Sequence, residues 1–160
     1  MKNTIGIIAE KLGHSLSPYI HNYWSKKYNK NLKYQKFEIS EKKLTKFFEA
    51  FRNNKKFKGF NVTIPYKTNF ISLCDKTTPK AKKIGSVNLV YKKNNLIIGD
   101  NTDVIGFEKS FKKLKKIQPK KILLIGAGGA ARSILYFLNN KNIENIDVFA
   151  TSLRRKENIC

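Results

Sequence analysis

Short apolar runs alternate with amphipathic segments along this chain. The run at 3–9 is too short for a helix and predicts a buried strand. Between Leu44 and Phe51, apolar residues recur at helical spacing and predict a helix over 41–52. Further strands are predicted at 32–39, 57–64, 86–91, 96–98, 121–125 and 145–151, and further helices at 17–28, 66–73, 79–84, 102–116 and after the glycines at 126–129.

This alternation of strands and helices is typical of an α/β architecture with a largely parallel sheet. No internal repeat or low-complexity linker interrupts it, and a second βαβ-like unit begins near Asn101. We therefore predict two domains, at 1–101 and 102–160. Four aromatic side chains are expected in the core: Trp24, Phe47, Phe48 and Phe51.

Composition predicts a folded protein with a strongly basic surface. Of the 160 residues, 41% are hydrophobic, which is enough for a core, and the formal net charge is +22. Such a charge suggests a polyanionic partner, such as nucleic acid or an acidic membrane surface. The lysines, however, are spread in pairs along the whole chain, which favours a solvated surface over a concentrated binding patch. A basic, non-catalytic nucleic-acid-binding module remains the alternative from another functional class.

The sequence gives no support to a membrane or metal function. No apolar run approaches the about 20 residues that span a bilayer, and Met1 leads straight into a strand, without the apolar segment of a signal peptide. We expect a cytoplasmic protein. Cys74 and Cys160 are far apart and belong to no Cys or His cluster, so free thiols and no metal are expected.

A glycine-rich turn joins the strand at 121–125 to the helix after it, as in the dinucleotide-binding fingerprint. Gly126 permits the tight turn, Gly128 lets the backbone approach a pyrophosphate, and Ala131 keeps the helix close to the strand. The helix N-terminus adds free N–H groups and a positive dipole end. The alternative is a glycine turn with a purely structural role. The residues predicted to contact the dinucleotide are Gly126, Ala127, Gly128, Gly129 and Ala130.

The dinucleotide is predicted to be NADP. Chains that bind NAD place a carboxylate at the end of the next strand, about 20 residues further on. This chain has Thr151 there, followed by Arg154 and Arg155, and no acid. A hydroxyl group and two guanidinium groups suit a 2′-phosphate, because arginine forms charge-assisted hydrogen bonds with phosphate.

Two polar clusters precede the glycine turn. Ser15 and Ser17 lie just before a helix, where Ser17 is either a plain N-cap or, with Ser15, a carboxylate cradle at the positive helix end. Asn61 and Thr63 end a strand, and Lys67 follows them. This places an amide, a hydroxyl and an amine at the carboxyl edge of a sheet, where α/β proteins bind ligands. A solvated surface lysine is the alternative for Lys67.

The motifs GHSLSPYIHN, GFNVTIPYK, GSVNLV, GDNTDVIGF and GAGGAAR occur in this order. Their combination and spacing resemble the shikimate dehydrogenase family, NADP-dependent enzymes of the aromatic amino-acid pathway, over nearly the whole chain. The resemblance implies reduction of 3-dehydroshikimate to shikimate by NADPH. It also implies a substrate-binding domain at 1–101, and at 102–160 the N-terminal part of a Rossmann-type NADP-binding domain. A quinate or quinate/shikimate dehydrogenase of the same family is the nearest alternative.

The resemblance further implies roles for single residues. Lys67 and Asp103 would form the acid/base pair, because negative charge grows on a carbonyl oxygen during hydride transfer and a nearby ammonium both stabilises and protonates it. For Asp103 the alternative is an acid that favours a helix N-terminus, with Thr102 as the cap. The implied substrate contacts are Ser15, Ser17, Thr63, Lys67, Asn88 and Asp103.

The chain departs from the family pattern in sequence and in length. Leu89 stands where the family usually has threonine. Residues 150–152 lack the usual arginine, so Arg154 or Arg155 would have to replace it. The chain ends at Cys160, before the second half of the nucleotide-binding sheet of the family. The hypothesis is therefore a truncated gene product or a fragment, monomeric or homodimeric, with little activity by itself.

Overall fold

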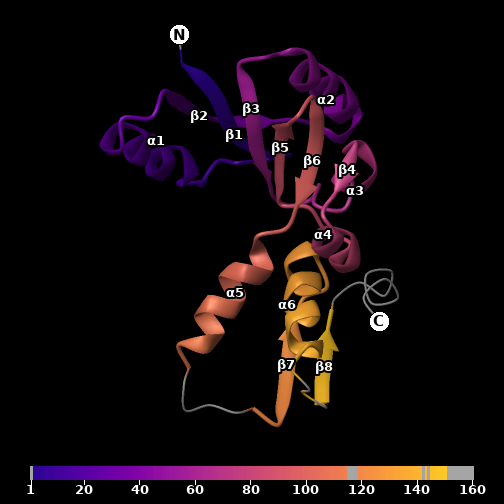
Figure 1. Cartoon of the computed structure of the whole chain (residues 1–160). Coiled ribbons are helices and arrows are strands. Elements are labelled where there is room, and N and C mark those ends of the chain that lie inside the picture. Colours follow the sequence, from indigo (N-terminus) through magenta and orange to yellow (C-terminus); the bar gives the residue numbers. More distant parts are fainter. Residues whose placement is uncertain (1, 115–118, 142, 144, 151–160) are drawn as a thin grey trace.

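A computed structural model of the chain describes residues 2–114, 119–141, 143 and 145–150 (Figure 1). The elements form two lobes that lie one above the other in Figure 1. The first lobe contains the elements from β1 to β6, and the second contains those from α5 to β8. The chain passes from one lobe to the other at Asn101, directly after β6.

The first lobe is built on a six-stranded sheet with the order β2-β1-β3-β5-β6-β4. β1 pairs in parallel with β2 and β3, and β4 pairs in parallel with β6. The pairings of β5 with β3 and β6 are antiparallel, so the predicted mostly parallel sheet is confirmed. The strands are β1 (Asn3–Ala9), β2 (Leu32–Glu38), β3 (Phe57–Val62), β4 (Lys76–Thr77), β5 (Leu89–Lys93) and β6 (Leu96–Asp100).

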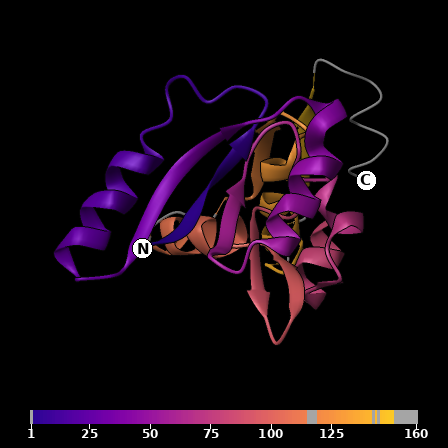
Figure 2. The same cartoon turned by 90° about the horizontal axis from the view of Figure 1, so that it is seen from above.

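Helices cover both faces of this sheet, as Figures 1 and 2 show for α1 and α2 on opposite sides. Side chains of α2, α3 and the sheet form an aromatic core that includes Phe48, Phe51, Phe60 and Phe70. A smaller cluster around Tyr34 forms on the α1 side. The helical elements are α1 (Ser17–Lys27), the 3-10 turn η1 (Glu41–Lys43), α2 (Leu44–Asn53), α3 (Phe70–Leu73) and α4 (Pro79–Ile84).

Some predicted boundaries in the first lobe were wrong. The helix expected from residue 66 begins at Phe70, because two consecutive turns come first, with Tyr66 N–H on the Thr63 carbonyl and Asn69 N–H on the Tyr66 carbonyl. The short strand β4 was not predicted. Trp24 was expected in the core but is 48% exposed. It lies on a helix that buries only Ser25.

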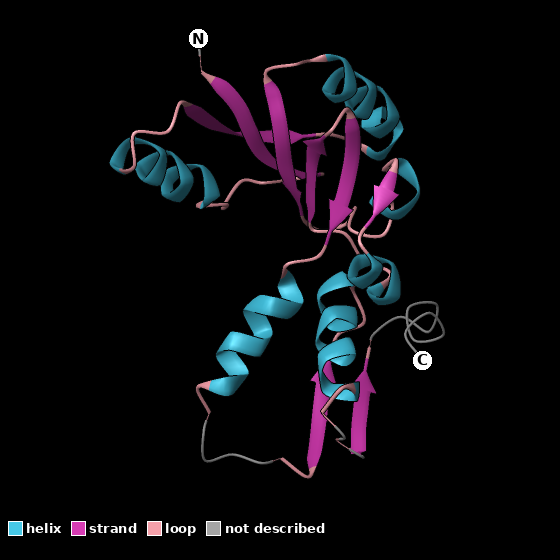
Figure 3. Cartoon of the chain, in the orientation of Figure 1, coloured by secondary structure: helices cyan, strands magenta, loops and turns pink. Residues whose placement is uncertain are grey.

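The second lobe places two helices against a pair of parallel strands (Figure 3). Val104, Phe137 and Leu138 form its core together with Ile84, which α4 of the first lobe supplies. Burial alternates along both strands, so that Leu123, Ile125 and Phe149 are exposed. The elements are α5 (Asp103–Lys112), β7 (Lys121–Ile125), α6 (Gly129–Asn139) and β8 (Asn145–Phe149). A parallel β7–α6–β8 unit is the first part of a Rossmann-type sheet.

No helix in the described ranges is both long and apolar enough to cross a bilayer. The same residues contain no group of three or more His, Cys, Asp or Glu side chains that could hold a metal ion. Cys74 is a free thiol, and burial raises its pKa to about 12. Cys160 lies outside the described residues.

Candidate active site

Lys67 and Asp103 meet between the two lobes. Lys67 lies on the turn after β3, where its carbonyl accepts a 2.8 Å hydrogen bond from the Val87 N–H. Asp103 is the first residue of α5. The Lys67 Nζ lies 2.6 Å from the Asp103 Oδ2, and the two side chains are 13% and 29% exposed. An amine and a carboxylate from separate elements therefore meet at a partly buried position.

Asn88 fixes the other oxygen of the same carboxylate. Its Nδ2 donates to Asp103 Oδ1 at 2.6 Å and to Thr102 Oγ1 at 3.0 Å, and its Oδ1 accepts from the Thr102 N–H at 2.8 Å. Asn88 is 9% exposed. Because one carboxylate oxygen binds Lys67 and the other binds Asn88, the Asp103 side chain is held in a single orientation.

The structure corrects two predicted helix caps. The Thr102 hydroxyl is bonded to Asn88, and the Val104 N–H of α5 is instead bound by Asn101 Oδ1 at 3.3 Å. Ser17 is the first residue of α1 rather than its N-cap, and the Ser15 Oγ accepts a 3.4 Å hydrogen bond from the Ser17 N–H. In both cases a residue one or two positions before the expected cap provides the side-chain oxygen.

The residues of the predicted carboxylate cradle come after the carboxyl ends of β1 and β3 along the chain. Ser15 and Ser17 follow β1 along the chain, and Thr63 follows β3, with its N–H on the Ile8 carbonyl at 3.1 Å. Tyr34 of β2 meets the end of β3, because its hydroxyl donates to Asn61 Oδ1 at 2.8 Å. Sequence reasoning did not single out Tyr34.

The glycine turn has the backbone that a pyrophosphate needs. Gly126 has φ 110°, a conformation that favours glycine, and a Cβ added at Gly126 or Gly128 would have no neighbour within 4 Å. The first turn of α6, from Gly129, carries no acidic side chain. Its first N–H groups lie at the positive end of the helix and receive no side-chain cap, which fits phosphate oxygens. Ala127 and Ala130 lie in the same turn, whereas Thr151, Arg154 and Arg155 lie outside the described residues.

The glycine turn also touches the catalytic lysine candidate. A Cβ added at Gly129 would come within 2.9 Å of the Lys67 Cβ and 2.7 Å of the Ser86 Oγ. The absence of a side chain at Gly129 thus lets the start of α6 pack directly on Lys67. A nucleotide bound along this turn would lie next to the Lys67–Asp103 pair.

A buried polar cluster holds the two lobes together, and sequence reasoning missed it. Asn101 is 0% exposed, and its Nδ2 donates to the Ser86 carbonyl at 3.0 Å and to the Ser133 Oγ at 2.9 Å. The Ser133 hydroxyl lies 3.2 Å from the Gly129 carbonyl. The Ser86 Oγ is also buried and has no partner in the described part of the chain. The sequence signal that could have indicated this cluster was the position of Asn101 inside the motif GDNTDVIGF.

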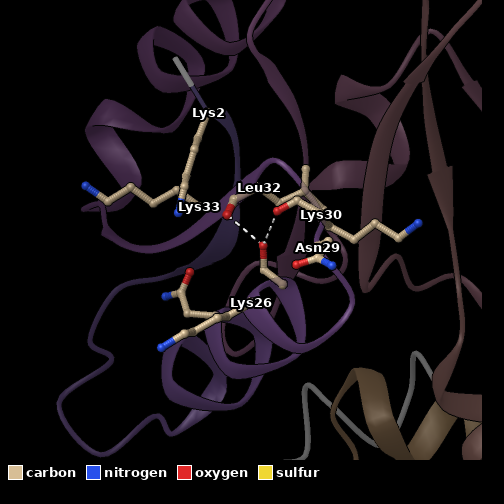
Figure 4. Close-up of a pocket in the computed structure, with 8 residues that line it drawn as sticks. Lys2, Lys26, Asn29, Lys30, Leu32 and Lys33 are labelled. Carbon is tan, nitrogen blue, oxygen red and sulfur yellow. Dashed lines mark hydrogen bonds between the residues drawn. The ribbon is translucent and has the colours of Figure 1, made fainter.

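Four lysines line a separate cavity of about 500 Å³ beside the C-terminal end of α1 (Figure 4). The amines of Lys26, Lys30 and Lys33 point in different directions in Figure 4 rather than toward a common centre. The Ser25 hydroxyl at this cavity is occupied by the Lys30 and Leu32 carbonyls, each at 2.8 Å. This arrangement does not favour the nucleic-acid alternative.

Comparison with known proteins points to one family. The family model for the shikimate dehydrogenase substrate binding domain matches residues 7–90 of this chain. A shikimate dehydrogenase (NADP(+)) from Pelagibacter ubique is 40% identical over 147 residues, which cover 91% of this chain and 55% of that protein. The chain therefore spans about half the length of this curated relative.

Solved structures show the same likeness. A shikimate dehydrogenase from Aquifex aeolicus superimposes with a TM-score of 0.87 at 37% identity, covering 98% of this chain and 59% of that one. A shikimate 5-dehydrogenase from Thermus thermophilus, solved in complex with NADP(H) and shikimate, gives a TM-score of 0.83 at 27% identity, covering 99% and 59%.

Proposed function

We propose that this chain, which belongs to the shikimate dehydrogenase family, takes part in the NADPH-dependent reduction of 3-dehydroshikimate to shikimate. This reaction serves chorismate and aromatic amino-acid biosynthesis. The observation that carries the proposal is the 2.6 Å contact between Lys67 Nζ and Asp103 Oδ2, beside the glycine turn. It brings an amine and a carboxylate next to the glycine turn, which supports an acid/base pair beside a bound nucleotide.

Lys67 acts on the oxygen of the reacting carbonyl. Bound NADPH supplies the hydride to the carbonyl carbon. As negative charge develops on the oxygen, the Lys67 ammonium stabilises it and donates the proton that completes the alcohol. Asp103 accepts a hydrogen bond from Lys67 and keeps the amine directed at this position. Asn88 holds Asp103 in turn, through its 2.6 Å hydrogen bond to Oδ1.

The remaining proposed contacts orient the ligands. Ser15, Ser17 and Thr63 bind the substrate carboxylate, and Asn88 and Asp103 contact ring hydroxyls. The turn at 126–130 binds the pyrophosphate through backbone N–H groups. Thr151, Arg154 and Arg155 are predicted to bind the 2′-phosphate of NADP.

The organisation of the chain belongs to the same proposal. We assign 1–101 to substrate binding and 102–160 to the first part of the NADP-binding domain, with the crossing at Asn101. The match of the substrate-binding family model to residues 7–90 supports the first assignment. We further predict a cytoplasmic monomer or homodimer that does not bind nucleic acid. Affinity for DNA that falls steeply with salt concentration would contradict the last prediction.

The test is an assay of this chain with shikimate and NADP, followed through the absorbance of reduced nicotinamide. Lys67→Ala is expected to lower turnover by about 10²- to 10⁴-fold, the usual contribution of a general acid or base, and to keep most of the shikimate affinity. Lys83→Ala is the matched control, since Lys83 is an exposed lysine on α4. It is expected to leave turnover unchanged.

Binding data separate a slow enzyme from a wrong assignment. Saturable shikimate binding with slow turnover would support the proposed substrate site and indicate a slow enzyme. Neither turnover nor saturable shikimate binding by the unmodified chain would refute the proposed function for this polypeptide. Replacing shikimate by quinate in the same assay distinguishes the two substrates of the family.

A further inference from the structure

Asn101, at the crossing between the lobes, and Ser133 of α6 form a buried polar contact. Both side chains are 0% exposed, so water cannot replace either partner. The Asn101 Nδ2 has two protons and donates one to the Ser133 Oγ at 2.9 Å and one to the Ser86 carbonyl at 3.0 Å. Turning the amide over would place Oδ1 against that carbonyl. The amide therefore has one favourable orientation.

The single proton of the Ser133 hydroxyl points into α6. Its Oγ lies 3.2 Å from the Asn101 Oδ1 and 3.2 Å from the Gly129 carbonyl, and it can donate to only one of them. The Oδ1 already accepts from the Val104 N–H at 3.3 Å. Donation to Gly129 therefore gives each group a partner of its own. The result is a directional chain of hydrogen bonds from Asn101 through Ser133 to the carbonyl at the start of α6.

The other hydrogen bonds of Asn101 lead to the acid/base pair. Its Oδ1 binds the Val104 N–H, one residue after Asp103. The Ser86 carbonyl is its second acceptor, and the N–H of the next residue donates to the Lys67 carbonyl at 2.8 Å. One buried amide therefore connects the backbone segments that carry Lys67 and Asp103.

Ser133 adds the nucleotide-binding turn to this network. Gly129 begins α6 and packs directly on Lys67, because a Cβ added at Gly129 would come within 2.9 Å of the Lys67 Cβ and 3.0 Å of its Cδ. Ser133 lies one helical turn later and bonds both to the Gly129 carbonyl and to Asn101. Its hydroxyl therefore holds the start of α6 at the place where α6 meets Lys67.

We propose that Ser133 is a positioning residue: its hydroxyl keeps the nucleotide-binding turn in a fixed position relative to the Lys67–Asp103 pair. The inference rests on the proposed function, because it takes a nicotinamide nucleotide as the ligand of the turn. Ser133 is completely buried and acts through Gly129 and Asn101 rather than on a ligand. Without the hydroxyl, the apolar core still holds α6, but its first turn can move away from Lys67.

The position of the turn can be measured without any ligand. Nuclear Overhauser effects between the Gly129 α protons and the Lys67 side chain report how closely the two pack. We expect them to be strong in the unmodified chain and weak in Ser133→Ala. Ser110→Ala is the matched control, since the exposed Ser110 hydroxyl also donates to a glycine carbonyl four residues earlier, at 3.1 Å. Equal effects in Ser133→Ala and the unmodified chain would overturn the inference.

Kinetics test the consequence for the reaction. In the assay with shikimate and NADP, Ser133→Ala should lower kcat per folded molecule by up to about 10²-fold, the cost of a small misplacement of reacting groups. KM for shikimate should stay unchanged, because the proposed carboxylate contacts belong to the first lobe. A purely structural role would lower the folded fraction and leave kcat per folded molecule at the value of Ser110→Ala, which would overturn the inference.

A double variant tests whether Ser133 acts through Asn101. Asn101→Ala combined with Ser133→Ala should be no slower than Asn101→Ala alone, because both changes break the same chain of hydrogen bonds. Independent losses that multiply would contradict this route. If the unmodified chain neither turns over nor binds shikimate, the proposed function fails, and the Gly129–Lys67 Overhauser effects still decide whether Ser133 positions the turn.

Discussion

The two lobes bury their apolar side chains differently. In the first lobe, helices cover both faces of the sheet, and Phe51, Phe70 and Ile8 are completely buried. In the second lobe, helices cover one face of β7 and β8, and Ile125 on the other face is 75% exposed. The first lobe thus has a core of its own, whereas the core of the second is smaller and shared.

The junction shows what the second lobe depends on. Ile84 of α4 belongs to the same cluster as Phe137 and Leu138 of α6, so the first lobe completes that core. Asn101 adds hydrogen bonds to Ser133 at the start of α6. The Lys67–Asp103 pair therefore joins a lobe that has its own core to a lobe whose core is completed by its neighbour.

The largest expected effect is in the first core. Phe51→Ala should lower the free energy of unfolding by about 3–5 kcal/mol, because a completely buried aromatic ring leaves a cavity among close-packed rings. Phe149→Ala, at a 57% exposed position of β8, should cost about 1 kcal/mol or less. Urea denaturation followed by circular dichroism measures both. Equal costs would mean that the two lobes do not differ in core stability.

The second-largest effect on stability is expected at the hydrogen bonds that join the two lobes. Asn101→Ala should cost about 1–3 kcal/mol, because it leaves the buried Ser86 carbonyl without its partner and removes the bond to Ser133. Amide hydrogen exchange should accelerate in α6 and stay slow in β3. Asn140→Ala is the control, since Asn140 is exposed directly after the same helix and its side-chain amide donates to the Tyr136 carbonyl. Unchanged exchange in α6 would show that Asn101 does not hold the second lobe.

The sequence predicted most of the architecture because its signals were local. Thr78 caps α4 by accepting from the Ala81 N–H, and Gly85 ends it at φ 67°, as their residue types suggest. The predicted hairpin between β5 and β6 turns through Asn94 and Asn95, both with positive φ. These features need only a few neighbouring residues, so a pattern reveals them.

The site was predicted less completely, because several of its contacts join residues far apart in the chain. Nothing near Tyr34 indicates that it meets Asn61, which is 27 positions away. Ser133 meets Asn101 across 32 positions. The capping role of Thr102 was wrong for a similar reason, since Asn88 competes for the Thr102 hydroxyl and lies 14 positions before it.

Acid sensitivity should also differ between the lobes. Hydrogen bonds from Arg52, and then from the Ile97 N–H, lower the pKa of Asp75 below its ordinary value of 3.8. A lowered pKa in the folded state stabilises the protein above pH 3.8, and this stabilisation is lost as the pH falls through the folded value. Asp75→Asn should cost about 1 kcal/mol at pH 7, since Arg52 is 43% exposed and the pair is screened.

Measuring the unfolding free energy at a series of pH values tests whether the Asp75 carboxylate causes the acid sensitivity. The difference in unfolding free energy between the unmodified chain and Asp75→Asn should shrink below pH 3.8. Glu108→Gln is the counterpart in the second lobe, where a hydrogen bond from Lys112 lowers the pKa of a partly exposed carboxyl. Its effect should be smaller and should disappear at high salt. A constant difference across the pH range would rule out Asp75 as a source of acid sensitivity.

The smallest effect is expected on the open face of β7. Leu123 is 62% exposed, so Leu123→Ser should change the unfolding free energy by no more than about 0.5 kcal/mol and should reduce self-association in light scattering. Ile122 precedes it in the strand but packs against the shared core of the second lobe. Ile122→Ser should therefore destabilise the chain several times more, although both changes replace one aliphatic residue of the same strand by serine. If the two variants were equally stable, β7 would lack the two distinct faces on which the contrast between the lobes depends.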